Sequence, residues 1–284
     1  MTDNFWRTGT EPVNGFAQFY RDWRPPNETT LPVLALHGSL SQSGSWNALA
    51  EAAQTIRMLC PDQRGFGLSG DPGDDSCAAF AADALALAQR LMPDRIAVMA
   101  HSFACSIALD VARKAPDRVA AVVLVDPVVR LQAPPPGAKP PPLELPDSFA
   151  TLDDAARYFR ETEEGAWPDA ALNRFVADIM LRDGDIGVWR FPYTVERLRR
   201  LRAFTGSPAG DYNLFPKAKD VRCPVLVFRG GASKRFSAQA EQPFADAFPA
   251  KPTIVVCPTS GHFPSTTETE LVVEAVREFL AGVK

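Results

Sequence analysis

The sequence predicts an α/β fold in which a mostly parallel sheet is covered by helices on both faces. Short apolar runs rich in Val, Leu and Ile recur without alternating polar residues, as is typical of strands buried on both faces. They occupy 32–36, 56–60, 96–100, 119–125, 224–228 and 253–257. Helical patterns separate them, over 46–53, 77–91, 102–114, 237–248 and 268–280. This alternation indicates right-handed β-α-β units in a doubly wound sheet.

The alternation has an N-terminal addition and one long interruption. Residues 15–23 are expected to form an antiparallel strand, and the regular pattern stops after residue 130. The interruption opens at 133–142 with too much proline for a helix or an inner strand. It continues with helical patterns near 153–163, 168–181 and 194–204. We therefore predict a core formed by 1–130 and 221–284, and a helical insertion formed by 131–220.

Composition excludes several classes of protein. The chain has 284 residues, 46% of them hydrophobic and 23% charged, which is an ordinary globular composition. A net charge of −4 gives no bulk field that would attract nucleic acid. No apolar run is long enough to cross a membrane, and the first residues do not resemble a signal peptide. Five scattered cysteines without a CxxC pair favour a reducing cytoplasm and no metal site.

A serine lies where a predicted strand passes directly into a helix. The segment Met99-Ala-His-Ser-Phe-Ala104 matches the nucleophile-elbow pattern G-x-S-x-G, with alanine at both glycine positions. The sharp turn requires small residues on either side and lifts the Ser102 hydroxyl above the sheet edge. The simpler alternative is that Ser102 only caps the helix.

Two further turns follow strand ends. His37-Gly38-Ser39 ends an earlier strand, and the backbone N–H of Ser39 could form an oxyanion hole together with the N–H of Phe103. The glycine-rich segment 61–69 is expected to be structural, with an ion pair between Asp62 and Arg64.

A histidine follows the last predicted strand. His262 stands between Gly261 and a loop, so it does not have the setting of a core histidine. The chain has three histidines, and the other two belong to the turns already described. His262 is therefore the candidate general base for Ser102.

The ordered motifs HG, DxRGxGxS, HS, VDP and GH together resemble the α/β-hydrolase superfamily, in its branch of serine hydrolases with a cap. The resemblance covers nearly the whole chain and implies a helical cap inserted after the sixth strand. It also implies a Ser-acid-His catalytic triad in that chain order, an oxyanion hole and no cofactor. We accordingly expect a hydrolase that acts on ester or amide bonds.

The acid of the triad departs from the commonest family pattern. In the family it usually follows the seventh strand, but this turn reads Arg229-Gly-Gly-Ala-Ser-Lys-Arg-Phe236, without a carboxylate. The other family location is the end of the sixth strand, where Asp126 stands. Asp126 is therefore the predicted acid. Glu241 and a dyad without an acid are the alternatives.

The insertion provides the candidates for substrate contacts. Arg190, flanked by Trp189 and Phe191, is the first choice, because an arginine facing the substrate would favour a carboxylate-bearing molecule. Trp167 and Tyr193 are aromatic candidates, and the cationic residues Lys234 and Arg235 lie near the triad end of the sheet.

Three hypotheses about the function of the protein stay open. The first is a serine hydrolase that cleaves a small ester or amide through an acyl-enzyme. The second is a carbon–carbon bond, lactone or thioester hydrolase, or a cofactor-free oxygenase, on the same fold. The third is a non-catalytic ligand receptor on a hydrolase scaffold. The expected partner is a small molecule, without nucleic acid or membrane, and a homodimer is left open.

Overall fold

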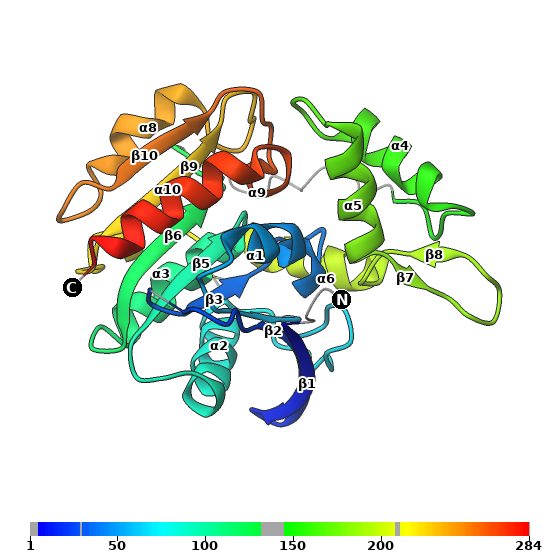
Figure 1. Cartoon of the computed structure of the whole chain (residues 1–284), viewed down its shortest axis with the longest axis horizontal. Helices are drawn as coiled ribbons and strands as arrows, with labels where there is room; N and C mark the ends of the chain where they lie inside the picture. The colour runs from blue at the N-terminus through cyan, green and yellow to red at the C-terminus, as the bar shows by residue number, and fades with distance from the viewer. Residues whose placement is uncertain (1–4, 29, 132–144, 208–210, 284) are drawn as a thin grey trace.

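The computed structural model describes residues 5–28, 30–131, 145–207 and 211–283, and it is an α/β structure built on one long sheet (Figure 1). The strands follow each other in the sheet in the order β1-β2-β4-β3-β5-β6-β9-β10. Their bounds are β1 (Trp6–Val13), β2 (Phe16–Trp23), β3 (Val33–Leu36), β4 (Met58–Pro61), β5 (Ile96–His101), β6 (Val119–Val125), β9 (Val225–Gly230) and β10 (Thr253–Cys257). From β4 to β10 all neighbouring strands are parallel. The predicted fold class is confirmed.

Helices cover both faces of the sheet. The described helices are η1 (Ser43–Trp46), α1 (Asn47–Ala53), α2 (Cys77–Leu91), α3 (Ala104–Lys114), α4 (Leu152–Thr162), α5 (Asp169–Ile179), α6 (Val195–Thr205), α7 (Leu214–Ala218), α8 (Ala238–Ala245), α9 (Pro264–Thr267) and α10 (Thr269–Ala281), and not all of them lie on the sheet. One apolar core joins the sheet to α2, α3 and α8, and a second core on the opposite face joins it to α1 and α10. The strands are buried on both faces, which explains their continuous apolar sequences.

The sequence predicts only the second strand of the N-terminal hairpin. β1 pairs with β2 in antiparallel register, and β2 pairs in the same way with β4. The turn between them is the two-residue sequence Asn14-Gly15, with φ angles of 44° and 88°. Asn-Gly at positive φ is the preferred two-residue hairpin turn. β1 is an edge strand that contains Gly9 and Pro12, so it lacks the apolar run of an inner strand.

The segment between β6 and β9 has two parts that pack differently. α4 and α5 share an aromatic core of their own, to which Phe263 of the histidine loop also belongs. α6 and α7 instead contribute Leu198, Leu201 and Leu214 to the core beneath the sheet. A short hairpin of β7 (Leu181–Arg182) and β8 (Trp189–Arg190) extends outward beside α5 (Figure 1). The proline-rich stretch 133–142 lies outside the described residues.

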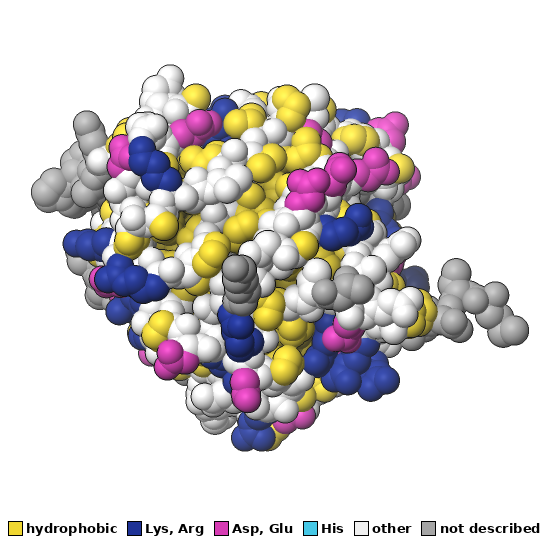
Figure 2. All heavy atoms as spheres, turned by 60° about the vertical axis from the view of Figure 1, so that its left-hand side comes forward, with side chains coloured by type: hydrophobic (Ala, Val, Ile, Leu, Met, Phe, Trp, Pro, Cys, Tyr) yellow, Lys and Arg dark blue, Asp and Glu magenta, His cyan; other side chains and the backbone are white. Residues whose placement is uncertain are grey.

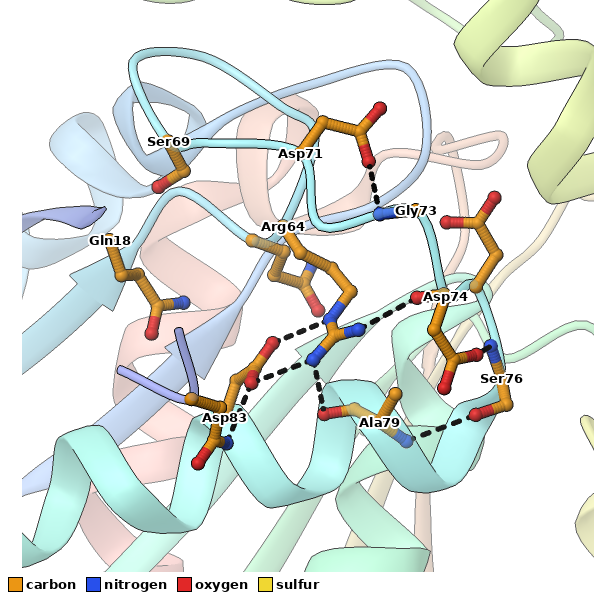
Figure 3. A network of polar contacts seen from close by, with 12 residues as sticks. Gln18, Arg64, Ser69, Asp71, Gly73, Asp74, Ser76, Ala79 and Asp83 are labelled. Atoms are coloured by element: carbon orange, nitrogen blue, oxygen red, sulfur yellow. Dashed lines mark hydrogen bonds and ion pairs between the residues drawn. The ribbon is translucent and has the colours of Figure 1, made fainter. Parts of the chain in front are cut away.

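The glycine-rich turn after β4 is held by buried ionic groups. The Arg64 guanidinium donates to both carboxylate oxygens of Asp83, at 2.6 and 2.8 Å, and to the carbonyls of Asp74 and Ala79 (Figure 3). The predicted pairing of Arg64 with Asp62 is therefore wrong. The Asp62 carboxylate accepts the backbone N–H groups of residues 43 and 68 instead, because a tight turn brings those two donors to it.

α6 is anchored to the core by a buried arginine. The Arg197 side chain is 3% exposed, and its Nη1 lies 2.7 Å from Oδ1 of the fully buried Asp75. Its Nη2 donates to the carbonyl of Arg64 at 2.9 Å. Gly65 has a φ of +73°, and a Cβ there would lie 2.0 Å from Arg197 Nε, so only glycine leaves room for this guanidinium.

The outer edge of β10 ends the sheet and is unpaired within the described residues. Ile254 and Val255 are half-buried and Val256 is 40% exposed. Figure 2 brings the left-hand side of Figure 1 forward and shows hydrophobic side chains among charged ones on this face. Such an edge can pair with a second chain, so a homodimer stays a prediction. Among the helices described, none is long and apolar enough to cross a bilayer.

We predict that Arg197→Met lowers the free energy of unfolding by about 3 kcal/mol, because it leaves the buried Asp75 without one of its two cationic partners. Arg200 still pairs with Asp75 in the variant. We therefore expect a loss of stability near the lower limit for a broken buried ion pair. Urea unfolding of the variant measures the effect. The control is Arg199→Met, whose side chain is 61% exposed on the same helix and which we expect to change stability by less than about 0.5 kcal/mol. Equal stabilities of the two variants would contradict the anchoring role.

Candidate active site

Ser102 occupies a strained turn between β5 and α3. Its φ is 60°, a conformation that non-glycine residues adopt uncommonly. Its N–H donates to the carbonyl of Val125 on β6 at 3.0 Å, and its own carbonyl accepts the N–H of Cys105 at 3.1 Å. The flanking Ala100 and Ala104 are fully buried, which explains why this turn has small residues on both sides. The strand-to-helix turn therefore has the geometry of a nucleophile elbow, with alanine in place of glycine.

A chain of hydrogen bonds links Ser102, His262 and Asp126. His262 Nε2 lies 2.8 Å from Ser102 Oγ, and His262 Nδ1 lies 2.7 Å from Asp126 Oδ2. An ionised carboxylate only accepts hydrogen bonds, so we assign the imidazole proton to Nδ1. Nε2 is then free to accept the hydroxyl proton of Ser102. The structure thus brings together the three residues that the sequence predicts as the triad.

The Asp126 carboxylate is fully buried and has three hydrogen-bond donors. Besides His262, the backbone N–H of Gly230 donates to Oδ1 at 2.9 Å and the Ser233 hydroxyl donates to Oδ2 at 2.6 Å. Sequence reasoning missed Ser233, which stands in the turn where the family usually has its acid. Glu241, the alternative acid, instead pairs with Arg229.

The histidine loop is fixed by close backbone contacts at glycines. A Cβ on Gly230 would lie 1.8 Å from the Gly261 carbonyl oxygen, and a Cβ on Gly261 would lie 1.7 Å from the carbonyl oxygen of Glu164. On the other side, the N–H of Ala166 donates to the carbonyl of Thr259 at 2.8 Å. The loop that carries His262 is therefore held between the end of β9 and residues 164–166 of the insertion.

The environment of His262 keeps its imidazole neutral. Burial and, to a smaller extent, the positive charge of Arg235 lower the pKa of His262 to about 3, against the negative charge of Glu164, which raises it. Burial raises the pKa of Asp126 to about 6, and the hydrogen bonds from Ser233 and Gly230 act against this rise. At neutral pH the pair is therefore a carboxylate beside a neutral imidazole, which is the form a general base needs.

The other two histidines have structural contacts. Burial lowers the pKa of His37 to about 4 and that of His101 to about 3, so both rings are neutral at neutral pH. His37 Nε2 accepts the N–H of Gln63 at 3.0 Å, and His101 Nε2 lies 2.6 Å from the His262 carbonyl oxygen. Within the described residues, no group of three or more His, Cys, Asp or Glu is arranged to hold a metal ion.

The predicted oxyanion-hole residues stand on either side of Ser102. Phe103 follows it at the start of α3, and Ser39 follows Gly38 after β3. A Cβ on Gly38 would lie 3.3 Å from Ser102 Cβ, so this turn runs directly against the serine. Among the described contacts, neither the Ser39 nor the Phe103 N–H donates to another protein group. Two backbone donors thus remain available beside the hydroxyl.

The predicted substrate-contact residues separate into two groups. Arg190 is exposed on the β7–β8 hairpin and pairs with Asp183 at 3.0 Å. Its contact with a substrate stays a prediction. Trp189 on the same hairpin is half-buried and exchanges backbone hydrogen bonds with Phe149. The sequence carries no periodic signal of this hairpin, because each of its strands has only two residues.

The other two candidates lie closer to the triad. The Trp167 ring is 5.4 Å from that of Phe263, the residue after His262. The Tyr193 ring is 5.8 Å from Phe66, which in turn contacts Phe103. Both Trp167 Nε1 and Tyr193 Oη are buried without a hydrogen-bond partner.

Comparison with known proteins identifies the family. The model of the alpha/beta hydrolase family matches residues 33–275. The chain belongs to this family. It is an alpha/beta-hydrolase enzyme, as the sequence predicts, and its relatives include named hydrolases and esterases.

Three similar proteins illustrate the range of relatives. The 2-(acetamidomethylene)succinate hydrolase of Mesorhizobium japonicum is 25% identical over 260 residues, which cover 87% of each chain. The lipase LipV of Mycobacterium tuberculosis is 32% identical over 140 residues, which cover 48% of this chain and 51% of the lipase. The crystal structure of E-2-(acetamidomethylene)succinate hydrolase superposes with a TM-score of 0.73 at 20% identity, over 98% of this chain and 100% of the other.

The charges around His262 predict opposite shifts in the pH profile of two variants. Removing a nearby positive charge in Arg235→Gln should raise the pKa of the acid limb of kcat/KM, and removing a negative charge in Glu164→Gln should lower it. Glutamine at 164 keeps an oxygen that can accept the backbone N–H of Lys234. The profiles are measured with a neutral ester, so that the substrate itself does not titrate. Shifts in the same direction for both variants would contradict this electrostatic assignment.

Proposed function

We propose that the protein is a serine hydrolase that cleaves a small ester or amide through an acyl-enzyme. The observation that carries the proposal is the continuous hydrogen-bond chain from Ser102 Oγ through His262 to Asp126, at 2.8 and 2.7 Å. The three groups follow the parallel strands β5, β6 and β10. They lie at the carboxyl ends of these strands, where active sites of this kind of sheet lie.

Each group of the proposed triad has one task. His262 Nε2 takes the proton of Ser102 as the hydroxyl attacks the substrate carbonyl, and Asp126 stabilises the imidazolium that forms. The N–H groups of Ser39 and Phe103 donate to the oxygen that becomes negatively charged. His262 then gives its proton to the leaving alcohol or amine. Water, deprotonated by His262, hydrolyses the acyl-enzyme by the same route.

In this proposal, residues 131–220 act as a cap over the core formed by 1–130 and 221–284. The aromatic core of α4 and α5 includes Phe263, so the cap packs directly beside His262. Trp167 and Tyr193 are the cap residues proposed to contact substrate. The substrate is a small molecule in the cytoplasm, and the name of the Mesorhizobium relative, a hydrolase of an acetamido-substituted succinate, supports an amide bond in a compact acid.

We predict that a fluorophosphonate probe labels the protein at Ser102 and that Ser102→Ala abolishes both labelling and ester hydrolysis. The matched control is Ser106→Ala, which changes a buried serine one turn further along α3, beside Cys77. Intact-mass analysis and hydrolysis of short 4-nitrophenyl esters give the two readouts. No labelling of the folded wild-type protein would favour the ligand-receptor alternative.

We further predict that Asp126→Asn reduces kcat by about 10⁴-fold, because the amide can donate to Nδ1 and so hold the wrong imidazole tautomer. Circular dichroism checks that the variant is folded. Glu241→Gln, which removes the alternative acid, should retain kcat within about twofold, since triad losses are orders of magnitude larger. Near-normal turnover in Asp126→Asn would exclude Asp126 as the acid of the triad.

A further inference from the structure

His101, the residue before Ser102, contacts the backbone of the proposed general base. Its Nε2 lies 2.6 Å from the carbonyl oxygen of His262. A carbonyl oxygen only accepts hydrogen bonds, so we assign the imidazole proton of His101 to Nε2, which donates it. Among the described backbone contacts, no N–H donates to this carbonyl. The side chain of His101 therefore supplies the hydrogen bond that a buried carbonyl oxygen requires.

His262 is consequently held at two points by two successive residues. Ser102 Oγ lies 2.8 Å from Nε2 of the His262 imidazole, while His101 binds the backbone carbonyl of the same residue. The first contact changes during the proposed reaction, because the proton of the Ser102 hydroxyl moves to Nε2. The second contact involves no reacting atom. It therefore keeps the backbone of His262 in place relative to the turn between β5 and α3 while the proton moves.

The ring of His101 also packs against two neighbouring segments. Its centroid lies 4.7 Å from that of the His262 ring and 4.9 Å from that of the Phe263 ring. A Cβ on Gly38 would lie 2.5 Å from His101 Nδ1, so the ring also lies directly against the turn that precedes Ser39. One buried side chain thus contacts both the histidine loop and the turn that carries a proposed oxyanion donor.

His101 makes these contacts without adding a charge. Burial lowers the pKa of His101 to about 3, and the neighbouring His262 contributes to the same direction, so the ring is a neutral donor at neutral pH. A cationic donor at this place would oppose the imidazolium that forms on His262 in the proposed reaction. A neutral histidine can therefore hold the carbonyl of His262 and leave the stabilisation of the imidazolium to Asp126.

We propose that His101 is a positioning residue, whose hydrogen bond to the His262 carbonyl sets the place of the imidazole relative to the Ser102 hydroxyl. The inference rests on the proposed function, because it concerns the proton transfers of the triad. A misplacement of about 1 Å can reduce a rate by about 10²-fold although every reacting group is present. Loss of the hydrogen bond should therefore lower kcat more than it changes KM.

The test compares His101→Met with His101→Gln, two variants whose new side chains have the same length. Glutamine places an N–H donor where histidine has Nε2, whereas methionine places a methyl group there. Both variants lose the ring contact with Phe263, so the difference between them reports the hydrogen bond. His101→Met should lower kcat for 4-nitrophenyl butyrate by about 10²-fold, and His101→Gln should recover at least about tenfold of that loss. Complete labelling of Ser102 by a fluorophosphonate counts the active molecules in each sample.

A second readout separates positioning from a role in stability alone. 4-Nitrophenolate leaves without a proton, whereas ethoxide must receive one from His262. The ratio of kcat/KM for ethyl butyrate to that for 4-nitrophenyl butyrate should therefore fall by about tenfold or more in His101→Met. A smaller fraction of folded protein lowers both values equally. The control is Phe175→Leu, which removes another ring that contacts Phe263, at 5.3 Å, and should leave the ratio unchanged.

Each result has one interpretation. Equal kcat values for His101→Met and His101→Gln would overturn the positioning role, as would a ratio of the two esters in His101→Met that equals that of the wild type. If the methionine variant does not fold, His101→Ala removes the donor without adding bulk and takes its place in both comparisons. Failure of the wild-type protein to hydrolyse either ester, together with no labelling of Ser102, would instead overturn the proposed function itself.

Discussion

The buried carboxylate of Asp126 ties together the three segments that build the site. A charge removed from water is tolerated only when donors surround it. Here those donors come from the end of β9, from the turn after it and from the histidine loop. The same three hydrogen bonds therefore satisfy the carboxylate and define where the imidazole lies. Any change in the relative positions of these segments would leave a buried charge unpaired, which is why their ends are held so closely.

Backbone strain accompanies this arrangement. Both Ser102 and Asp126 have positive φ, at 60° and 43°, although neither is glycine. Each such residue costs about 1–3 kcal/mol, and it persists only where the surrounding structure determines its conformation. The N–H of Ser102 donates to β6 and that of Asp126 donates to the carbonyl of Phe228 on β9. Hydrogen bonds across the strand ends thus stabilise the two turns that carry Ser102 and Asp126.

The sequence alone predicts those parts of the fold and of the candidate site that leave a local pattern in it. Buried parallel strands produce continuous apolar runs, and Ser102 and His262 both stand in turns that follow such runs. Arg190 shows the limit, because its ion pair with Asp183 depends on the pairing of two-residue strands, which no periodicity in the sequence reveals. Ser233 shows it as well. Its importance comes from its hydrogen bond to Asp126, 107 positions away in the chain, and its own local sequence is ordinary.

The close packing of residues 164–166 on the histidine loop has a consequence for how this enzyme could diversify. Because Gly261 lies against both Gly230 and the carbonyl of Glu164, the insertion is part of the support of the imidazole. Exchange of the entire insertion for one of different shape would remove that support, so new specificities are more accessible by substitutions within α4–α6. The junction at Glu164–Ala166 therefore restricts which insertions could replace this one while leaving His262 in place.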